Sequence, residues 1–205
     1  MISFDPARPN FAPYGFTCEV WTPVPMKRPD RHNEIELNLL THVTLHYLLG
    51  GERVTVHAGR LAMFWAAIPH QIVESADRTE YFVATIPLTW FLQCHFPAPV
   101  VHAVLHGQIL FDPDTDRAGD DFGLFRRWVQ DFKTCDPARR RLVQLEMEAR
   151  LLRFALSVPT QKSKNQKSRQ TLSHTSVGEL SRVEQMAGFI AQNYTRKLMV
   201  DEISR

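Results

Sequence analysis

The sequence lacks most of the local patterns that mark a particular chemistry or a membrane location. Its three cysteines, Cys18, Cys94 and Cys135, lie far apart and form no CxxC pair, so neither a disulfide framework nor a zinc site is indicated. The most apolar run, residues 61–69, is about half the length that a bilayer requires. Residues 1–10 hold no apolar stretch behind a basic start, so we expect no signal peptide and a cytoplasmic protein.

Two common signatures of catalysis are also absent from the sequence. No serine stands in surroundings that resemble a nucleophile elbow, so acyl-transfer chemistry has no support. No glycine-rich phosphate loop is present, which removes the usual nucleotide-binding signature. Hydrophobic residues nevertheless make up 44% of the chain and charged residues 22%, and this composition is typical of a globular protein with a real core.

Charge is divided unevenly along the chain. Residues 1–158 hold 16 Lys and Arg against 18 Asp and Glu, whereas residues 159–205 hold 8 against 4. A basic C-terminal part behind a slightly acidic one is what we expect of a sensor joined to a nucleic-acid-binding segment. Residues 159–178 hold no acidic residue and little that is apolar, so they are predicted to form a flexible basic linker.

The N-terminal half has the pattern of an all-β protein. From residue 16 to about 111, short apolar or alternating runs are separated by turn residues, which is typical of a sandwich or barrel. Gly50 and Gly51 predict a tight hairpin, because glycine accepts positive φ. The runs are 16–21, 34–40, 43–49, 52–56, 60–66, 71–75, 81–86 and 107–111. We therefore predict a mostly β fold, a jelly-roll barrel over residues 1–115.

Helices are predicted to follow the barrel. Residues 88–94 and 100–106 fit short helices, and residues 120–132 place aromatic and aliphatic side chains at helical spacing. Asp136 and Pro137 mark the start of a longer helix that ends near residue 157. One broad face of that helix carries Leu142, Leu145, Leu152 and Leu156. This face either packs on the barrel or forms a dimer interface, and both alternatives remain open.

Several segments resemble AraC-type transcription regulators. EQMAGFIAQNYTRKLMVDEISR, residues 184–205, resembles the first helix and the opening of the second helix of their helix-turn-helix domain. Residues 31–40, 47–72, 86–92 and 106–110 are similar in order and spacing to the sensor half of such a regulator, and FWAAIPHQ at 64–71 is the most specific piece. The resemblance extends from about residue 16 to Arg205.

That resemblance implies a cupin-type barrel that binds a small effector, often a sugar, followed by dimerisation helices at 116–158, the linker at 159–178 and a DNA-reading unit. Residues 179–205 hold only an incomplete start of that unit, without the recognition helices that enter major grooves. We therefore expect the chain to be the sensing and dimerising part of a regulator and not an enzyme. Its expected partners are an effector and a second copy, with DNA bound only through the full-length helix-turn-helix domain and no membrane contact.

The stretch RHNEIELN, residues 31–38, carries the candidate site. In a strand, its polar residues share one face while Ile35 and Leu37 share the other. In a cupin-type barrel the polar face points into the lumen. A sugar needs carboxylate and amide partners together with an aromatic ring against its apolar face. The predicted effector site therefore consists of His32, Glu34, Glu36, Asn38 and His70, with Tyr47 or Trp65 as the ring.

The same strand also permits a metal site. Cupin enzymes hold a metal with an HxH pair, a Glu four residues on and a later His, and this pattern falls on Asp30, His32, Glu36 and His70. Oxygen and imidazole donors of this kind bind Mn, Fe or Zn. Asp30 stands where the first His would be, which weakens the signature. A metal-dependent cupin enzyme or metal-binding module is therefore the alternative, and we expect no cofactor.

Overall fold

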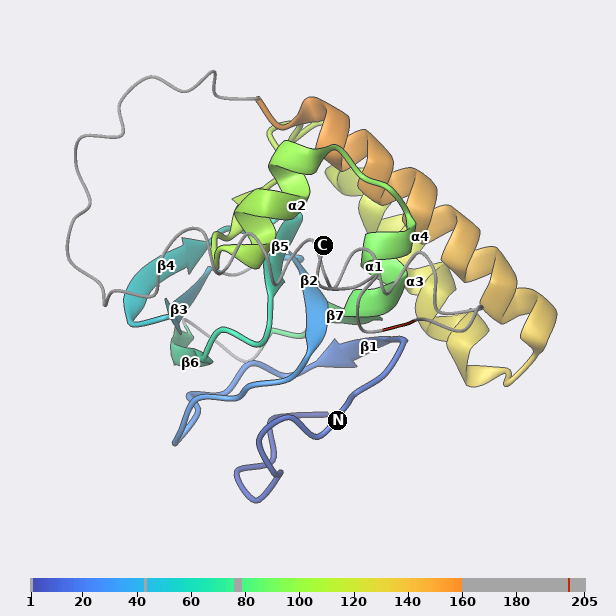
Figure 1. The fold of residues 1–205 in the computed structure, drawn as a ribbon. Helices are drawn as coiled ribbons and strands as arrows, with labels where there is room; N and C mark the ends of the chain where they lie inside the picture. Colours follow the sequence, from blue (N-terminus) through green and yellow to red (C-terminus); the bar gives the residue numbers. More distant parts are fainter. Residues whose placement is uncertain (1, 43, 76–78, 160–198, 200–205) are drawn as a thin grey trace.

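The computed structural model describes residues 2–42, 44–75, 79–159 and 199 (Figure 1). The described residues form two antiparallel sheets, one in the order β1-β7-β2-β5-β8 and the other in the order β4-β3-β6. The strands are β1 Thr17–Trp21, β2 Glu34–Leu40, β3 Leu45–Leu49, β4 Glu52–Val56, β5 Ala62–Trp65, β6 His70–Ser75, β7 Tyr81–Pro87 and β8 Leu110–Phe111. Each lies within one of the runs predicted from the sequence or overlaps most of it, so a mostly β fold is confirmed.

Two local features explain where the strands end. Gly50 and Gly51 adopt φ values of 59° and 90° between β3 and β4, so the predicted hairpin is present and uses a conformation that glycine accepts without strain. The run at 107–111 gives a much shorter strand than we predicted. Gly107 takes φ of 78° directly after a helix, and regular pairing with β5 begins only at Leu110.

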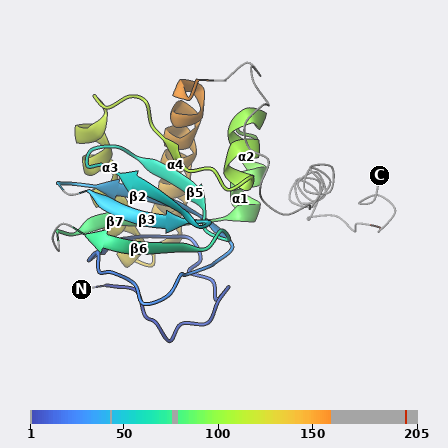
Figure 2. The ribbon, with the colours of Figure 1, turned by 90° about the vertical axis from the view of Figure 1, so that its left-hand side faces the viewer.

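The two sheets face one another across a polar and aromatic interior. The hydroxyl of Tyr47 on β3 donates to Oδ1 of Asn38 on β2 at 2.7 Å, and the Tyr47 ring lies 6.2 Å from that of Phe64 on β5. The N-terminal segment lies below the strands in Figure 2, on the side away from α2. Its attachment to the edge strand β1 includes a parallel bridge between Ile2 and Trp21.

Four helices follow the strand β7 among the described residues: α1 Leu88–Gln93, α2 Ala98–Leu105, α3 Ala118–Lys133 and α4 Pro137–Ser157. They coincide closely with the predicted helices. Asp136 caps α4 as predicted, because its Oδ1 accepts a hydrogen bond from the Ala138 amide at 2.9 Å. No helix in this part of the chain combines the length and the apolar character that crossing a bilayer requires.

The main apolar core lies between the five-stranded sheet and the two long helices. Ile35 and Leu37 of β2 belong to the same buried cluster as Phe125 and Trp128 of α3 and Phe154 of α4. In Figure 1, α4 runs along one outer edge of the molecule with α3 beside it. This packing buries one face of the central strand in hydrocarbon, so the polar side chains of the same strand point to the opposite face.

The helix α4 presents two different faces. Its buried residues include Val143, Met147, Leu151 and Phe154, which pack on the main core. The leucines that we singled out from the sequence are on the outer face, with 48% exposure for Leu142, 48% for Leu145, 42% for Leu152 and 71% for Leu156. The alternative that this leucine face packs on the barrel is therefore wrong, because the helix contacts the core through a different face.

A buried ion cluster attaches α4 to the rest of the molecule. The guanidinium of Arg150 donates from Nε and Nη2 to the carboxylate of Asp121 on α3, at 2.6 and 2.7 Å, and Nη2 also donates to Asp112 after β8. All three side chains are almost fully buried. Within the described residues the remaining nitrogen, Nη1, has no hydrogen-bond partner. The cluster holds two carboxylates against one guanidinium, so each carboxylate depends on Arg150.

The predicted linker at 159–178 and the predicted helix-turn-helix start at 179–205 lie outside the described residues, apart from Pro159 and Met199. Nothing in the fold tests the boundaries proposed for them.

Replacement of Arg150 by Met tests the ion cluster. Arg150→Met keeps much of the side-chain volume but leaves Asp112 and Asp121 buried without a counter-charge, which is expected to lower the free energy of unfolding by about 3–5 kcal/mol. Urea denaturation followed by circular dichroism measures the loss. Arg127→Met, at an exposed position on α3, is the matched control and is expected to change stability by less than about 0.5 kcal/mol. Equal stability of the two variants would contradict this role for Arg150.

Candidate functional site

The alternation of β2 builds the polar side of the site. This strand pairs with β7 along one edge and with β5 along the other, so neither of its edges is open. Glu36 and Asn38 point toward the three-stranded sheet. There Asn38 Nδ2 donates to Glu36 Oε1 at 2.8 Å, and Tyr47 donates to Asn38 from the facing sheet. A carboxylate and an amide buried at this depth are tolerated because their polar atoms are hydrogen-bonded.

His32 is held between two carboxylates just before β2. Its Nδ1 donates to Glu34 Oε2 at 2.9 Å and its Nε2 to Glu36 Oε2 at 3.1 Å, and the ring is fully buried. Both acceptors are carboxylate oxygens, so both ring nitrogens carry a proton and the imidazole is cationic. We call this arrangement of His32, Glu34 and Glu36 the histidine clamp.

The pKa values of the clamp follow from competition between burial and pairing. Burial alone would lower the pKa of His32, but its hydrogen bonds to Glu34 and Glu36 outweigh burial and raise it to about 9. Burial would raise the pKa of Glu36, yet the hydrogen bond from His32 and the adjacent positive charge hold it below its usual range. Glu34 follows the same direction for the same reasons, with the amide of Gly15 as a further donor.

His70 and Asp30 complete the polar end of the site. A backbone bridge pairs the two residues, and His70 Nε2 lies 3.7 Å from Glu36 Oε2. Burial lowers the pKa of His70, so this imidazole is neutral at pH 7. Asp30 accepts a hydrogen bond from the Tyr14 hydroxyl at 3.0 Å and forms an ion pair with Arg8 at 3.4 Å. Arg8 and Tyr14 both belong to the N-terminal segment, which is therefore part of the site.

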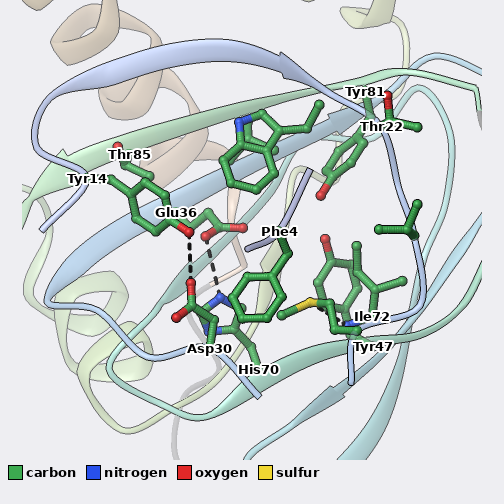
Figure 3. Close-up of a pocket in the computed structure, with 14 residues that line it drawn as sticks. Phe4, Tyr14, Thr22, Asp30, Glu36, Tyr47, His70, Ile72, Tyr81 and Thr85 are labelled. Atoms are coloured by element: carbon green, nitrogen blue, oxygen red, sulfur yellow. Dashed lines mark hydrogen bonds and ion pairs between the residues drawn. The ribbon is translucent and has the colours of Figure 1, made fainter. Parts of the chain in front are cut away.

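A small cavity lies between the two sheets beside these groups (Figure 3). Its volume is about 30 Å³, enough for one water molecule. Glu36, Asp30 and His70 form its polar end, and Figure 3 shows the Phe4 ring between that end and Tyr47. The remaining lining residues are Tyr14, Trp21, Thr22, Val24, Met26, Ile72, Tyr81, Val83 and Thr85. The cavity therefore combines carboxylates, hydroxyls and aromatic rings within a few ångströms.

One lining group has no hydrogen-bond partner in the part of the chain that the structure describes. The Thr22 hydroxyl is buried and makes no hydrogen bond within the described residues. A buried hydroxyl without a partner costs free energy, so the position is one where a bound molecule or a water gains a hydrogen bond.

The structure brings together most of the residues singled out from the sequence, and separates one of them. His32, Glu34, Glu36, Asn38, Tyr47 and His70 form one connected polar group. Trp65 lies elsewhere, because on β5 the side chain that faces the interior is that of Phe64, which contacts His70, while Trp65 pairs with Ile35 and packs on the main core. A tryptophan one position away in an alternating strand faces the opposite side.

Several residues of the site had no signal in the sequence. Phe4, Tyr14 and Arg8 lie in a Pro-rich N-terminal segment without periodicity, and only tertiary contacts place them over the interior. Tyr81 is different, because it opens a strand that we did predict. Alternation along 81–86 places Tyr81, Val83 and Thr85 on one face, so this part of the lining was accessible from the pattern.

The alternative metal site has part of the required geometry. One donor atom from each of Asp30, His32 and His70 lies within 4.8 Å of the others, and all three residues are buried. The two ring nitrogens of His32, however, both hydrogen-bond carboxylates, and Asp30 is paired with Arg8. An ion would have to displace a proton from His32 and compete with Arg8, so the side chains as arranged satisfy one another without an ion.

Comparison with known proteins gives a clear resemblance. The chain is 28% identical over 173 residues to the melibiose operon regulatory protein of Escherichia coli strain K12, and equally to that of E. coli O6:H1 strain CFT073. The matches cover 84% of this chain and 57% of each relative, so the chain spans little more than half the length of these relatives. They confirm the resemblance to transcription regulators indicated by the sequence motifs. No family model matches the chain.

Two solved structures are also similar. The AraC-like transcriptional activator CuxR aligns with a TM-score of 0.49 and 8% identity, over 83% of this chain and 55% of CuxR. ToxT K231A from Vibrio cholerae strain SCE256 aligns with a TM-score of 0.45 and 9% identity, over 96% of this chain and 70% of ToxT. TM-scores of this size do not establish a common fold.

The histidine clamp predicts a pH dependence of stability. The pKa of His32 is about 9 in the folded protein and 6.5 as the ordinary value, so its stabilisation is fully present below pH 6.5 and is lost as pH rises toward 9. The free energy of unfolding is expected to fall by roughly 3 kcal/mol over that range, and His32→Gln is expected to remove this slope. Urea titrations at several pH values measure both. The pKa of His70 is lowered in the folded protein, so its protonation changes the free energy of unfolding only below pH 6.5. It therefore does not contribute to the slope measured between pH 6.5 and 9.

Proposed function

We propose that this chain is the ligand-sensing and dimerising part of an AraC-type DNA-binding transcription regulator. The similarity to the melibiose operon regulatory proteins across 84% of the chain supports the regulatory role. In this proposal residues 1–115 are a cupin-type effector barrel, 116–158 the dimerisation segment, 159–178 a basic linker and 179–205 the start of a helix-turn-helix unit. The protein acts in the cytoplasm, has no enzymatic role, and reads DNA through the full-length regulator.

The observation that most directly supports the proposal is the polar and aromatic interior between the two sheets. Small-molecule sites are concave, largely apolar and contain a few polar groups that determine specificity. Here Glu36 and His70 supply such groups, while Tyr47, Trp21 and Tyr81 supply rings around them. The helices that pack on the outer face of the same sheet give the interior a physical connection to the rest of the regulator.

Charge at the site selects the class of effector. Three carboxylates, Asp30, Glu34 and Glu36, meet two cationic groups, Arg8 and the protonated His32. The balance is negative, so an anionic effector such as a sugar acid or a phosphate ester would be repelled at short range. An uncharged polyol instead donates hydroxyl hydrogens to carboxylates and presents its apolar face to a ring. We therefore propose a neutral sugar or a similar polyhydroxylated molecule.

Effector entry requires the N-terminal segment to move. A cavity of about 30 Å³ is much smaller than the roughly 300–1,000 Å³ of a typical small-molecule site. Phe4 and Tyr14 occupy space beside the polar groups, and Arg8 and Tyr14 attach their segment to Asp30. The closed form has the N-terminal segment over the cavity, and in the open form this segment has moved away. An effector that replaces these contacts shifts the population toward the open form, and the size of the shift depends on how much its affinities for the two forms differ.

Metal binding is the second candidate function, and the grouping of Asp30, His32 and His70 is the observation that favours it. Elemental analysis of protein purified without a histidine tag separates the two candidates. Stoichiometric iron, manganese or zinc would support a metal-dependent cupin, whereas a substoichiometric content supports the effector proposal.

Removal of the Thr22 hydroxyl tests the effector site without disturbing the fold. Thr22→Val replaces an unpaired buried hydroxyl with a methyl group of similar shape, so stability is expected to be unchanged or slightly higher. Affinity for a neutral sugar that raises the melting temperature is expected to fall by about 5–10-fold, because one hydrogen bond is lost. Calorimetric titration measures this, with melibiose as the first probe because the relatives are named for it.

Thr55→Val removes a hydroxyl on β4 that hydrogen-bonds His46 away from the cavity, and it serves as the control for the change in affinity. An equal loss of affinity in both variants would count against a role for Thr22. A panel of neutral sugars that leaves the wild-type melting temperature unchanged would count against the sugar class itself.

Dimerisation is proposed to use the exposed leucine face of α4. Large apolar side chains that stand together on one helix face are a common mark of a protein interface. Leu145→Glu is expected to produce monomers at concentrations where the wild type is dimeric, because a charge in the apolar interface has no partner. Light scattering after size-exclusion chromatography measures the mass. Val73→Glu, at an exposed apolar position on β6, is expected to leave the dimer intact.

A further inference from the structure

We propose that a second ligand site lies at the junction of α3 and α4, where it binds the phosphoryl group of a small molecule. A surface cavity of about 470 Å³ opens there and shares no lining residue with the cavity between the sheets. We call it the arginine cavity. It is lined from α3, from the residue before α3 and from the second half of α4 by Arg117, Gly119, Asp120, Asp121, Gly123, Leu124, Arg127, Arg150 and Arg153.

Arg150 brings an unused hydrogen-bond donor to this cavity. The residue is only 4% exposed, and its Nε and Nη2 form the edge of the guanidinium that meets Asp121, while Nη2 also reaches Asp112. The third nitrogen, Nη1, projects away from that edge and has no acceptor among the described residues. A buried N–H group without an acceptor costs free energy, so the arrangement favours a bound molecule that supplies one.

Two further guanidiniums of the lining are not engaged in ion pairs. Arg127 and Arg153 are exposed on α3 and α4, and neither forms an ion pair in the part of the chain that the structure describes. Arg117 differs, because its Nε is paired with Asp114 at 2.6 Å. Arg127, Arg153 and the free nitrogen of Arg150 therefore offer donors from two helices to one cavity.

Two glycines keep the α3 side of the cavity open. Gly119 and Gly123 lie one turn apart inside this helix, although glycine is a poor helix former. A Cβ atom at Gly119 would meet no atom within 4 Å, and one at Gly123 would meet only Nη1 of Arg127, at 3.6 Å. Packing within the described residues therefore requires neither glycine. Their effect is to leave room for a ligand beside the arginines.

The carboxylates of the cavity leave the unpaired arginines available. Asp121 already accepts two hydrogen bonds from Arg150, and Asp112 lies behind the cavity and does not line it. Asp120 is the other lining carboxylate, and it is exposed, so water and salt weaken its repulsion of an anion. An anion therefore binds on the side of Arg127 and Arg153, away from Asp120.

The number of donors selects a phosphoryl group over a carboxylate. A phosphate monoester carries up to two negative charges and three acceptor oxygens, and the planar fork of arginine matches its geometry. A carboxylate offers one charge and two oxygens, which leaves one of the three guanidiniums without an acceptor. The cavity volume is within the range of typical small-molecule sites, so an organic group fits beside the phosphoryl group. The structure thus favours a phosphate monoester over inorganic phosphate.

Calorimetric titration of the 205-residue chain with inorganic phosphate and with glucose 6-phosphate tests the site. Arg127→Gln and Arg153→Gln are each expected to weaken the binding of glucose 6-phosphate by about tenfold, because a charge-assisted hydrogen bond is lost. Arg126→Gln is the matched control, since Arg126 is the exposed neighbour on α3 that does not line the cavity. It is expected to change the affinity by less than about twofold.

Two further variants separate loss of the site from loss of the fold. Asp120→Asn removes a repulsive charge and is expected to tighten the binding of glucose 6-phosphate by about threefold. Gly123→Leu fills the cavity with the side chain of a better helix former, so binding is expected to disappear while the melting temperature stays the same or rises. Neither result can arise from partial unfolding.

The source of the phosphoryl group follows from the two probes. Tighter binding of glucose 6-phosphate supports a phosphate monoester, and equal binding supports inorganic phosphate as the occupant. Unchanged affinity in Arg127→Gln and Arg153→Gln, or no binding of either probe, would overturn the site. Displacement of glucose 6-phosphate by duplex DNA of random sequence would instead assign these arginines to a nucleic-acid backbone and would also overturn it. The proposed sugar site is judged separately, through Thr22→Val.

Discussion

The contact on which the interior depends is the imidazolium of His32 between Glu34 and Glu36. Carboxylates are rarely buried unless they are paired, and this strand carries two of them into the space between the sheets. The cation lies just before the strand and reaches both carboxylates, so the polar face of β2 can point inward while Ile35 and Leu37 build the main core on the other side. Without that cation the strand would bury two uncompensated negative charges.

The same physical solution occurs a second time, at the helices. Arg150 neutralises Asp112 and Asp121 much as His32 neutralises its two glutamates, and it joins the end of the sheet to α3 and α4. The histidine clamp lies in the interior between the two sheets, whereas the Arg150 cluster lies where the residue after β8 meets α3 and α4. A rearrangement of the interior therefore acts on a sheet whose other face carries α4, and α4 carries the leucine face proposed for pairing. In the proposed function, this continuity gives effector binding a route to the dimer through packed elements and not through a loop.

Alternation and turn residues were enough to predict most of the fold. The strands follow runs such as 34–40 and 81–86, where every second side chain is of one kind, and Asp136 with Pro137 marked the start of α4. Alternation also selected Glu36 and Asn38 as neighbours. It could not place Trp65, because an even and an odd position in β5 differ only in which face they occupy, and a four-residue strand offers little pattern from which to choose. Arg8, Phe4 and Tyr14 were missed for a different reason, since their segment has no period and is positioned by Asp30, Arg31 and Trp21 from elsewhere.

The central claim is that the interior recognises an uncharged polyhydroxylated molecule. The most direct test is ligand-observed NMR with matched pairs of hexoses and their uronic acids, which differ only by a carboxylate. The account predicts that at least one neutral sugar transfers saturation from the protein and that its acid does not, because Asp30, Glu34 and Glu36 outnumber the cations around them. Binding of the acids in preference to the neutral sugars would contradict it.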